Sequence, residues 1–184
     1  MTRTDRLLSE LHAYVPADDA EKAHRDGMVH LLTKRAEVFS RAHFAPGHVT
    51  ASCFIVDGDG LLLLHHHRRL NRWLQMGGHV ESDELPHVAA LREGTEESGL
   101  PDLTLTPAAI FDLDIHGIPA GKGEPDHDHY DVRYVARTAK PAAITIDRAE
   151  SNELAWVTLE RAAELMPGPE SRRVIRKLRE RSLH

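Results

Sequence analysis

The chain of 184 residues is long enough to bury the core of one domain, with 41% hydrophobic and 28% charged residues. Its formal net charge of −6 excludes a general affinity for the backbone of nucleic acids, which needs concentrated positive charge. The sequence contains no apolar run near the roughly 20 residues of a membrane helix and no apolar leader segment. We therefore expect a cytoplasmic protein that binds neither a nucleic acid polymer nor a membrane.

Residues 1–45 are expected to form a helical N-terminal extension. Leucines recur at helical spacing over residues 5–15 until Pro16 ends the segment, and a second amphipathic helix with an acidic start follows over 17–39. Residues 46–184 combine strand and helix patterns, and we expect them to form the functional domain.

Strand signals begin shortly after residue 46. The apolar runs 49–56 and 61–64 flank the turn sequence DGDG and predict a β-hairpin. Residues 73–82 are expected to form a short strand that runs into a loop with a pair of glycines. Further strands are expected within 105–118, 129–139 and 153–159, and further helices over 83–98, 160–166 and 169–182.

Three glutamates on the predicted helix 83–98 are the strongest chemical signal. Glu93, Glu96 and Glu97 stand at positions i, i+3 and i+4, so their side chains share one helix face. Like charges at this spacing repel each other, which raises the pKa of a carboxyl group and weakens the helix. A hard divalent cation with oxygen ligands, such as Mg²⁺, removes this conflict better than the neighbouring Arg92 can alone.

The residues around the three glutamates form a fixed frame: a glycine, five residues, a glutamate, seven residues, REGTEE, one residue, and GL. This 23-residue frame resembles the Nudix box of the Nudix hydrolase superfamily. The matching positions are Gly78, Glu84, Arg92, Glu93, Glu96, Glu97, Gly99 and Leu100. Gly94 departs from the bulky aliphatic residue that the family prefers, and is expected to loosen the packing of the helix at a cost of about 1 kcal/mol in helix propensity. Met76 stands where proline is frequent.

The resemblance implies an α/β protein with the Nudix fold, a mixed β-sheet sandwiched between α-helices. It also implies hydrolysis of the diphosphate linkage in a nucleoside diphosphate joined to another moiety, such as a nucleoside triphosphate or ADP-ribose. By the family pattern Mg²⁺ or Mn²⁺ is bound by Glu93, Glu96, Glu97 and the carbonyl of Gly78. Arg92 and Glu84 are expected to pair and to hold the loop against the helix.

The expected mechanism is attack of water on phosphorus, with the metal neutralising the phosphates and a carboxylate accepting a proton. Glu97 is one candidate for the proton acceptor, and a glutamate near the strand 153–159 is the other, either Glu150 or Glu153. The candidate catalytic residues are Glu97, Glu96, Arg92 and Glu153.

Several basic side chains are candidates for binding substrate phosphates. Arg68 and Arg72 follow the first hairpin, where they either contact a phosphate or only decorate a loop. His127, His129 and Arg133 alternate along a predicted strand and would share one face, which is either part of a site or an ordinary polar surface.

Two other functions remain open. A Nudix-fold module that senses a nucleotide without cleaving it is one, although such modules usually lack one or more of the carboxylates that are present here. Isopentenyl diphosphate isomerase shares the fold, but its catalytic cysteine lies beside the glycine pair, whereas Cys53 here lies in a distant apolar strand. The expected partner is a small nucleotide, and a homodimer is possible.

Overall fold

The structure is a computed structural model, and it describes residues 1–34, 37–105, 107–121 and 123–182. The chain forms two compact units that interleave along the sequence. The first contains Met1–Ser52, Gly78–Ala90 and Ala108–Tyr134, and the second contains Cys53–Gly77, Leu91–Pro107 and Val135–His184. Three long elements contribute to both units: strand β1 (Gly47–Val56), helix α3 (Pro86–Ser98) and strand β7 (His127–Arg137).

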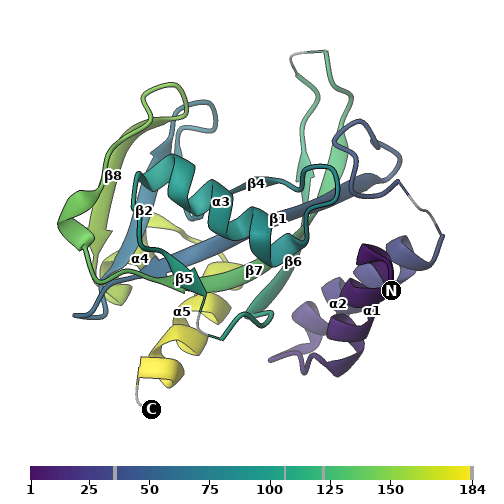
Figure 1. Cartoon of the computed structure of the whole chain (residues 1–184), viewed down its shortest axis with the longest axis horizontal. Helices are drawn as coiled ribbons and strands as arrows, with labels where there is room; N and C mark the ends of the chain where they lie inside the picture. Colours follow the sequence, from purple (N-terminus) through teal and green to yellow (C-terminus); the bar gives the residue numbers. More distant parts are fainter. Residues whose placement is uncertain (35–36, 106, 122, 183–184) are drawn as a thin grey trace. The chain divides into compact units, whose positions relative to one another are not determined.

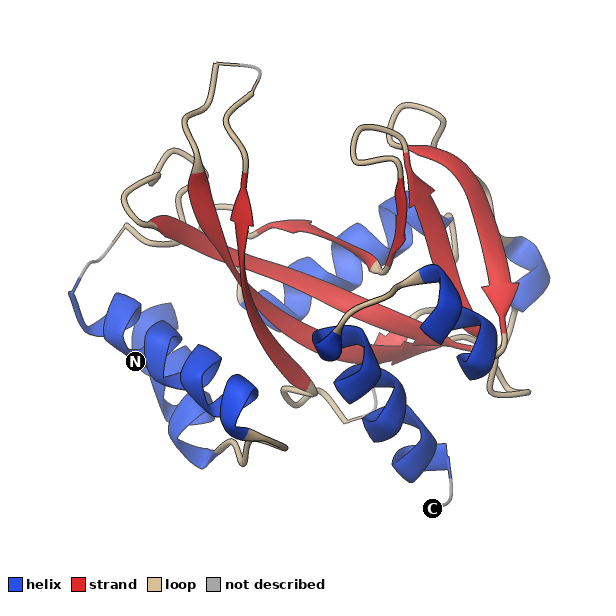
Figure 2. Ribbon diagram, turned by 180° about the vertical axis from the view of Figure 1, so that it is seen from behind, coloured by secondary structure: helices blue, strands red, loops and turns tan. Residues whose placement is uncertain are grey.

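The first unit begins with two helices, α1 (Arg3–Ala13) and α2 (Asp19–Lys34), which pack side by side (Figures 1 and 2). A capping box starts α1, where the Thr2 hydroxyl accepts the Asp5 N–H and the Asp5 carboxylate accepts the Thr2 N–H. The buried faces carry the leucines and methionine expected from their spacing: Leu7, Leu11, Met28, Leu31 and Leu32.

Helix α2 is attached to strand β6 (Asp112–Ile118) by a buried carboxylate. Glu21 is fully buried and accepts hydrogen bonds from the N–H of Ala17 at 2.6 Å and of Leu113 at 3.2 Å. The Tyr14 hydroxyl also donates to it. Through these hydrogen bonds the buried Glu21 carboxylate joins the helical extension to the sheet.

The strands of the first unit are β1, β4 (Met76–His79), β6 and β7. Strand β4 pairs with β1, and β6 pairs with β7 in antiparallel register, with Asp114 opposite Asp131 and His116 opposite His129. Directly opposed residues lie on the same face of a sheet. The register therefore gathers the polar side chains of β6 and β7 on one face.

In the second unit the hydrogen-bonded strand order is β3, β2, β1, β7, β5, with β8 paired to β2. The bounds not yet given are Leu62–His67 for β2, Arg72–Leu74 for β3, Thr104–Leu105 for β5 and Ser151–Val157 for β8. The unit also contains the 3-10 turn Pro141–Ala143, α4 (Leu159–Leu165) and α5 (Pro169–Ser182), and α4 and α5 pack on each other. The apolar side chains of β2 and α5 supply much of its core.

Most of the expected elements are present, with two differences. The second helix ends at Lys34 among the described residues, while residues 35–36, which the prediction included, lie outside them. The expected strand over 73–82 is divided into β3 and β4, which pair with different strands. Pairing with two partners is a tertiary property that the local pattern does not contain.

Candidate active site

Helix α3 presents the three predicted glutamates and ends where the sequence indicated. Gly99 follows the helix with φ of +71°, and its N–H donates to the Thr95 carbonyl at 2.8 Å. A glycine is favoured there because it adopts the left-handed conformation without strain. Residues 91–98, which carry all three glutamates, belong to the second unit.

Glu97 is the most buried of the three carboxylates, with 4% of the residue exposed. The N–H of Gly77 donates to its Oε2 at 2.8 Å. The pKa of Glu97 is raised to about 9, chiefly by burial; the Gly77 N–H opposes this shift, and the nearby Glu93 and Glu150 carboxylates add to it. A divalent cation beside Glu97 would favour its ionised form.

Arg92 neutralises part of the remaining charge. Its Nη1 lies 2.9 Å from Oε1 of Glu93 and 3.2 Å from Oε2 of Glu96. Burial nevertheless raises the pKa of Glu93. Arg92 opposes this shift, whereas repulsion from Glu96 and Glu150 adds to it. Arg92 thus positions two of the carboxylates through its ion pairs with Glu93 and Glu96.

Of the two downstream glutamates, the structure brings Glu150 to the cluster. The Glu150 carboxyl forms a side-chain hydrogen bond with Glu97, and its charge raises the pKa of both Glu93 and Glu97. Glu153 instead lies exposed in β8, opposite His66 of β2. The structure therefore places Glu150, rather than the predicted Glu153, beside the cluster; position along the chain could not distinguish a residue before the strand from one within it.

His65 lies beside the cluster without supplying charge. Its Nδ1 is 3.9 Å from Oε1 of Glu97 and 2.7 Å from the Ser151 hydroxyl. Burial lowers the pKa of His65 to about 4, and the neighbouring His67 lowers it further. At neutral pH the imidazole is uncharged, so it cannot take the place of a metal beside Glu97.

The donor set fits a hard divalent cation. Carboxylate oxygens are the ligands that Mg²⁺ and Mn²⁺ prefer, and a buried group of them needs positive charge to remain ionised. The pKa values of Glu93 and Glu97 are both raised, and a cation bound between the two carboxylates would favour the ionised form of each. Glu84 and Gly78, two other residues of the predicted frame, belong to the first unit, where Glu84 Oε2 accepts the N–H of Glu81.

The candidate phosphate-binding residues fall into different surroundings. Arg68 lies near the carboxylates, because its backbone N–H donates to the Glu150 carbonyl at 2.7 Å and its Nη1 donates to the Arg148 carbonyl at 3.0 Å. Arg72 is exposed at the start of β3, opposite His67. Both arginines share the second unit with Glu93, Glu96 and Glu97.

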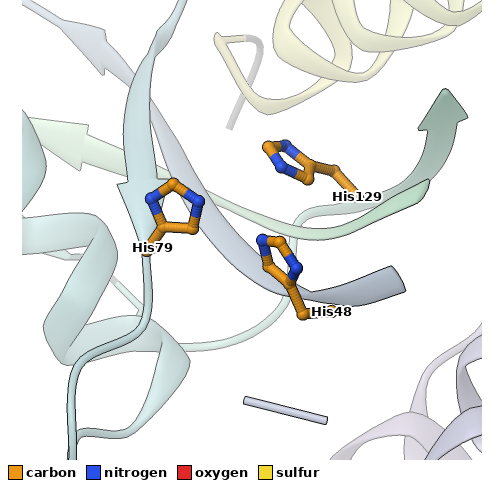
Figure 3. A group of neighbouring side chains, drawn as sticks. All are labelled: His48, His79 and His129. Atoms are coloured by element: carbon orange, nitrogen blue, oxygen red, sulfur yellow. The ribbon is translucent and has the colours of Figure 1, made fainter. Parts of the chain in front are cut away.

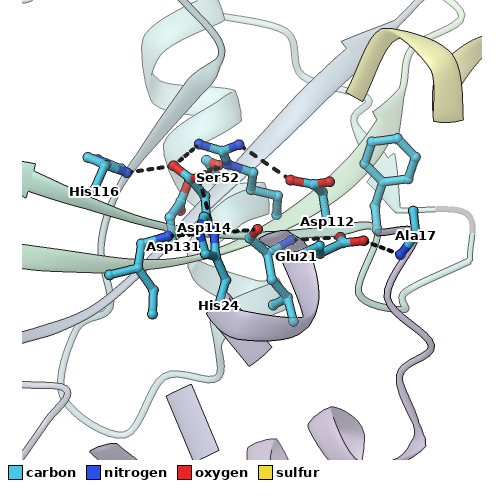
Figure 4. Close-up of polar contacts among 12 residues, drawn as sticks. Ala17, Glu21, His24, Ser52, Asp112, Asp114, His116 and Asp131 are labelled. Carbon is cyan, nitrogen blue, oxygen red and sulfur yellow. Dashed lines mark hydrogen bonds and ion pairs between the residues drawn. The ribbon is translucent and has the colours of Figure 1, made fainter. Parts of the chain in front are cut away.

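Arg133 is buried in the first unit. Its partners are Asp112, Asp114 and Asp131, which Figure 4 labels. It donates to Asp131 at 2.9 Å through Nε, to Asp114 at 2.7 Å through Nη2 and to Asp112 at 3.4 Å through Nη1. Asp131 also accepts hydrogen bonds from Ser52 and Thr50. The guanidinium is fully engaged by carboxylates, so we leave Arg133 out of the substrate site; the alternation that drew attention to it reflects the β6–β7 pairing.

His127 and His129, the other candidates on β7, lie in a cluster of imidazoles in the first unit together with His48 and His79. The sequence did not single out His48 or His79, because they are far from β7 along the chain. His48 and His79 lie in the strands at residues 47–56 and 76–79, and this strand placement is the only feature of theirs that the sequence could indicate.

Comparison with known proteins identifies the family. The chain matches the NUDIX domain family over residues 46–178, and it belongs to that family. The resemblance seen in residues 78–100 is therefore confirmed, as is the fold class: a mixed β-sheet with helices and a helical N-terminus, as in Nudix hydrolase structures.

Individual relatives are distant. A Mycobacterium tuberculosis protein with the provisional name 8-oxo-dGTP diphosphatase 3 is 30% identical over 114 residues, covering 59% of this chain and 49% of that protein. The chain thus matches about half the length of this relative. A Lactococcus lactis subsp. cremoris protein with the provisional name DHNTP pyrophosphohydrolase is 28% identical over 157 residues, covering 84% and 87% of the two chains. Among solved structures, a NUDIX-family hydrolase from Clostridium perfringens is 30% identical with a TM-score of 0.54, covering 72% of this chain and 97% of that one.

Among the described residues, no helix has the length and apolar character that crossing a membrane requires.

Proposed function

We propose that this protein is a metal-dependent Nudix pyrophosphohydrolase that cleaves the diphosphate linkage of a small nucleotide. The observation that carries the proposal is the carboxylate cluster of Glu93, Glu97 and Glu150, in which two pKa values are raised by burial and mutual repulsion. Carboxylates gathered around the buried Glu97 are costly to a fold, and a cation-assisted reaction is a physical reason to keep them.

In this proposal Glu93, Glu96 and Glu97 hold Mg²⁺ or Mn²⁺, and the Gly78 carbonyl stays a ligand expected from the family pattern alone. The bound metal supplies neutralisation of the phosphate charge and a lowered pKa for water. Arg92 keeps Glu93 and Glu96 in position through its two ion pairs. The N–H of Gly77 orients Glu97 through the hydrogen bond to Oε2.

Glu150 is the proposed proton acceptor. It belongs to a turn, where the Glu150 N–H donates to the Asp147 carbonyl at 3.3 Å, and its side chain reaches Glu97. A carboxylate that lies beside the metal ligands can accept the proton of an attacking water. Arg68, whose N–H is bonded to the Glu150 carbonyl, and Arg72 are the proposed contacts for substrate phosphates.

The substrate class remains part of the proposal. The relatives named above carry the names of 8-oxo-dGTP and DHNTP hydrolases, and both compounds belong in a substrate panel with ordinary nucleoside triphosphates and ADP-ribose. The cytoplasmic location and the possible homodimer stay predictions from the sequence and the family.

The test measures release of phosphate, pyrophosphate or nucleoside monophosphate from this panel, with Mg²⁺, with Mn²⁺ and with a chelator. We expect cleavage that requires the metal and that is lost in Glu96→Gln. Glu150→Gln should lower kcat by about 10²-fold or more, the usual contribution of a general base, while the matched variant Glu153→Gln should stay within about twofold of wild type.

Each outcome separates the alternatives. Binding of a nucleotide without cleavage in any metal would overturn the hydrolase and leave a sensor. Equal losses in Glu150→Gln and Glu153→Gln would contradict the assignment of Glu150. Isopentenyl diphosphate isomerase is disfavoured, because Cys53 is fully buried in β1 and Gly94 packs on its sulfur.

A further inference from the structure

Three histidines outside the acidic cluster converge in the first unit (Figure 3). His48 belongs to β1, His79 is the last residue of β4 and His129 belongs to β7. One ring nitrogen from each of the three lies within 4.8 Å of those of the other two. We propose that His48, His79 and His129 form a binding site for a transition-metal dication of the Zn²⁺ class, separate from the carboxylate site on α3.

The hydrogen bonding of His48 gives the first support. Its Nδ1 lies 3.2 Å from the carbonyl oxygen of His43, and because a carbonyl can only accept, Nδ1 must carry the proton. The neutral ring therefore exposes an unprotonated Nε2. A backbone carbonyl that fixes the tautomer in this way is the usual partner of a histidine that ligates a metal.

The surroundings of that nitrogen give the second support. His48 is 1% exposed, and among the described residues its Nε2 has no hydrogen-bond partner. A buried acceptor without a partner is costly and rare in native structures. A metal ion at the centre of the three imidazoles would satisfy it.

The backbone around His48 is built for a close approach of β1 to β7. A Cβ at Gly47 would lie 1.8 Å from the carbonyl oxygen of Asp128, so only glycine fits there. The Asp128 N–H donates to the Pro46 carbonyl at 2.9 Å. These contacts bring His48 next to His129, with ring centroids 4.9 Å apart.

The ligand type selects the metal. Imidazole nitrogens suit Zn²⁺, Co²⁺, Ni²⁺ and Cu²⁺, whereas Mg²⁺ prefers oxygen. Tetrahedral Zn²⁺ with Zn–N bonds of about 2.05 Å needs nitrogens roughly 3.3 Å apart, so small rotations of the side chains would complete the geometry.

Three histidine ligands would leave one position of a tetrahedral ion for water or another ligand. The ring of His127 stacks on that of His48 at 5.1 Å, and its Nδ1 donates to the Pro125 carbonyl at 2.8 Å. With three histidine ligands joining β1, β4 and β7, the ion would tie together strands of the first unit.

In the experiment the full chain is titrated with Zn²⁺ in the presence of excess Mg²⁺, and calorimetry measures the binding. A parallel titration with Co²⁺ uses its visible absorption as a spectroscopic probe. We expect about one equivalent of tightly bound Zn²⁺, a rise in Tm on binding and the intense visible absorption of tetrahedral Co²⁺. His129→Gln and His79→Gln should each lower the affinity by at least about tenfold, with the metal-free fold preserved by circular dichroism.

Two controls give the test its specificity. His66→Gln alters a histidine of β2 outside the three-histidine cluster and should leave the affinity unchanged. The double variant Glu96→Gln/Glu97→Gln removes carboxylates of the acidic site and should also retain the Zn²⁺. The absence of Zn²⁺ binding in the wild type, or loss of binding in either control with retention in His129→Gln, would overturn the proposal. Neither result depends on whether the protein hydrolyses a nucleotide.

Discussion

At the scale of single residues, Glu97 links the proposed metal site to stability. Its pKa is raised by burial from an ordinary value of 4.5 to about 9. The stabilising contribution of the protonated carboxyl is fully present below pH 4.5 and is lost as the pH rises toward 9. Ionisation of Glu97 without metal therefore destabilises the fold in the neutral and alkaline range.

We expect Glu97→Gln, which remains neutral, to raise the Tm of the metal-free protein relative to wild type at pH 8 but not at pH 4.5. The difference in unfolding free energy should exceed about 1 kcal/mol, the equivalent of less than one pKa unit. Thermal unfolding at both pH values in chelator measures it. Added Mg²⁺ should raise the Tm of wild type more than that of the variant.

The matched control is Glu96→Gln, since the Glu96 side chain is 59% exposed. Its Tm difference from wild type should change little between the two pH values. If Glu97→Gln behaves in the same way as this control, the pKa of Glu97 is not raised in the folded protein.

A second residue-scale prediction concerns Arg133. Its charge is surrounded by the buried carboxylates of Asp112, Asp114 and Asp131, and the three aspartates favour its charged form against the effect of burial. Burial alone would raise the pKa of Asp114, but hydrogen bonds from His116 and His24 and the charge of Arg133 hold it well below its usual range.

Arg133→Met should lower the unfolding free energy by roughly 3–5 kcal/mol, because it leaves uncompensated buried charges. Urea denaturation at pH 7 measures this loss. The exposed Arg137, on the same strand, supplies the control Arg137→Met, which should cost less than about 0.5 kcal/mol. Similar effects of the two substitutions would show that the ion-pair network contributes nothing particular to stability.

At the scale of elements, Gly94 determines how closely α3 packs in the second unit. A Cβ at this position would lie 2.7 Å from Sγ of Cys53 and 3.3 Å from Cδ1 of Leu103. The expectation that Gly94 loosens this packing was therefore wrong: the missing side chain allows a close contact. Where the family prefers a bulky aliphatic side chain, the Cys53 sulfur occupies the corresponding space in this protein.

Gly94→Ala should destabilise the protein by about 1–3 kcal/mol, because overpacking outweighs the gain of about 1 kcal/mol in helix propensity. Combining it with Cys53→Ala removes the sulfur and should restore part of the loss. A double-mutant cycle from denaturant unfolding should give a coupling energy of about 1–2 kcal/mol. Strict additivity would mean that the helix shifts away from the strand instead.

At the scale of the whole molecule, the question is how the N-terminal helices join the region that matches the family, residues 46–178. The buried Glu21 of α2 accepts the N–H of Leu113 in β6, and the His24 ring contacts the same strand. We propose that the extension unfolds together with the strands that it contacts, although it lies outside the family match.

Glu21→Ala should lower the unfolding free energy by about 1–3 kcal/mol, since it leaves the buried N–H of Leu113 without its acceptor. The loss should appear in the main thermal transition. Glu10→Ala, which removes a surface ion pair with Arg6, should cost less than about 1 kcal/mol. A separate early transition in Glu21→Ala would indicate that the extension unfolds independently.

The sequence by itself determined the family, the helix that carries Glu93, Glu96 and Glu97, and the glycine that ends it. These features depend on residues within a few turns of one another, and helical periodicity and backbone sterics act over that range. Only the tertiary structure placed Glu150, and not Glu153, beside Glu97, enclosed Arg133 among aspartates and brought His48 and His79 to His129. Strand pairing joins residues tens of positions apart, and which of their side chains meet depends on register and burial, which no local pattern contains.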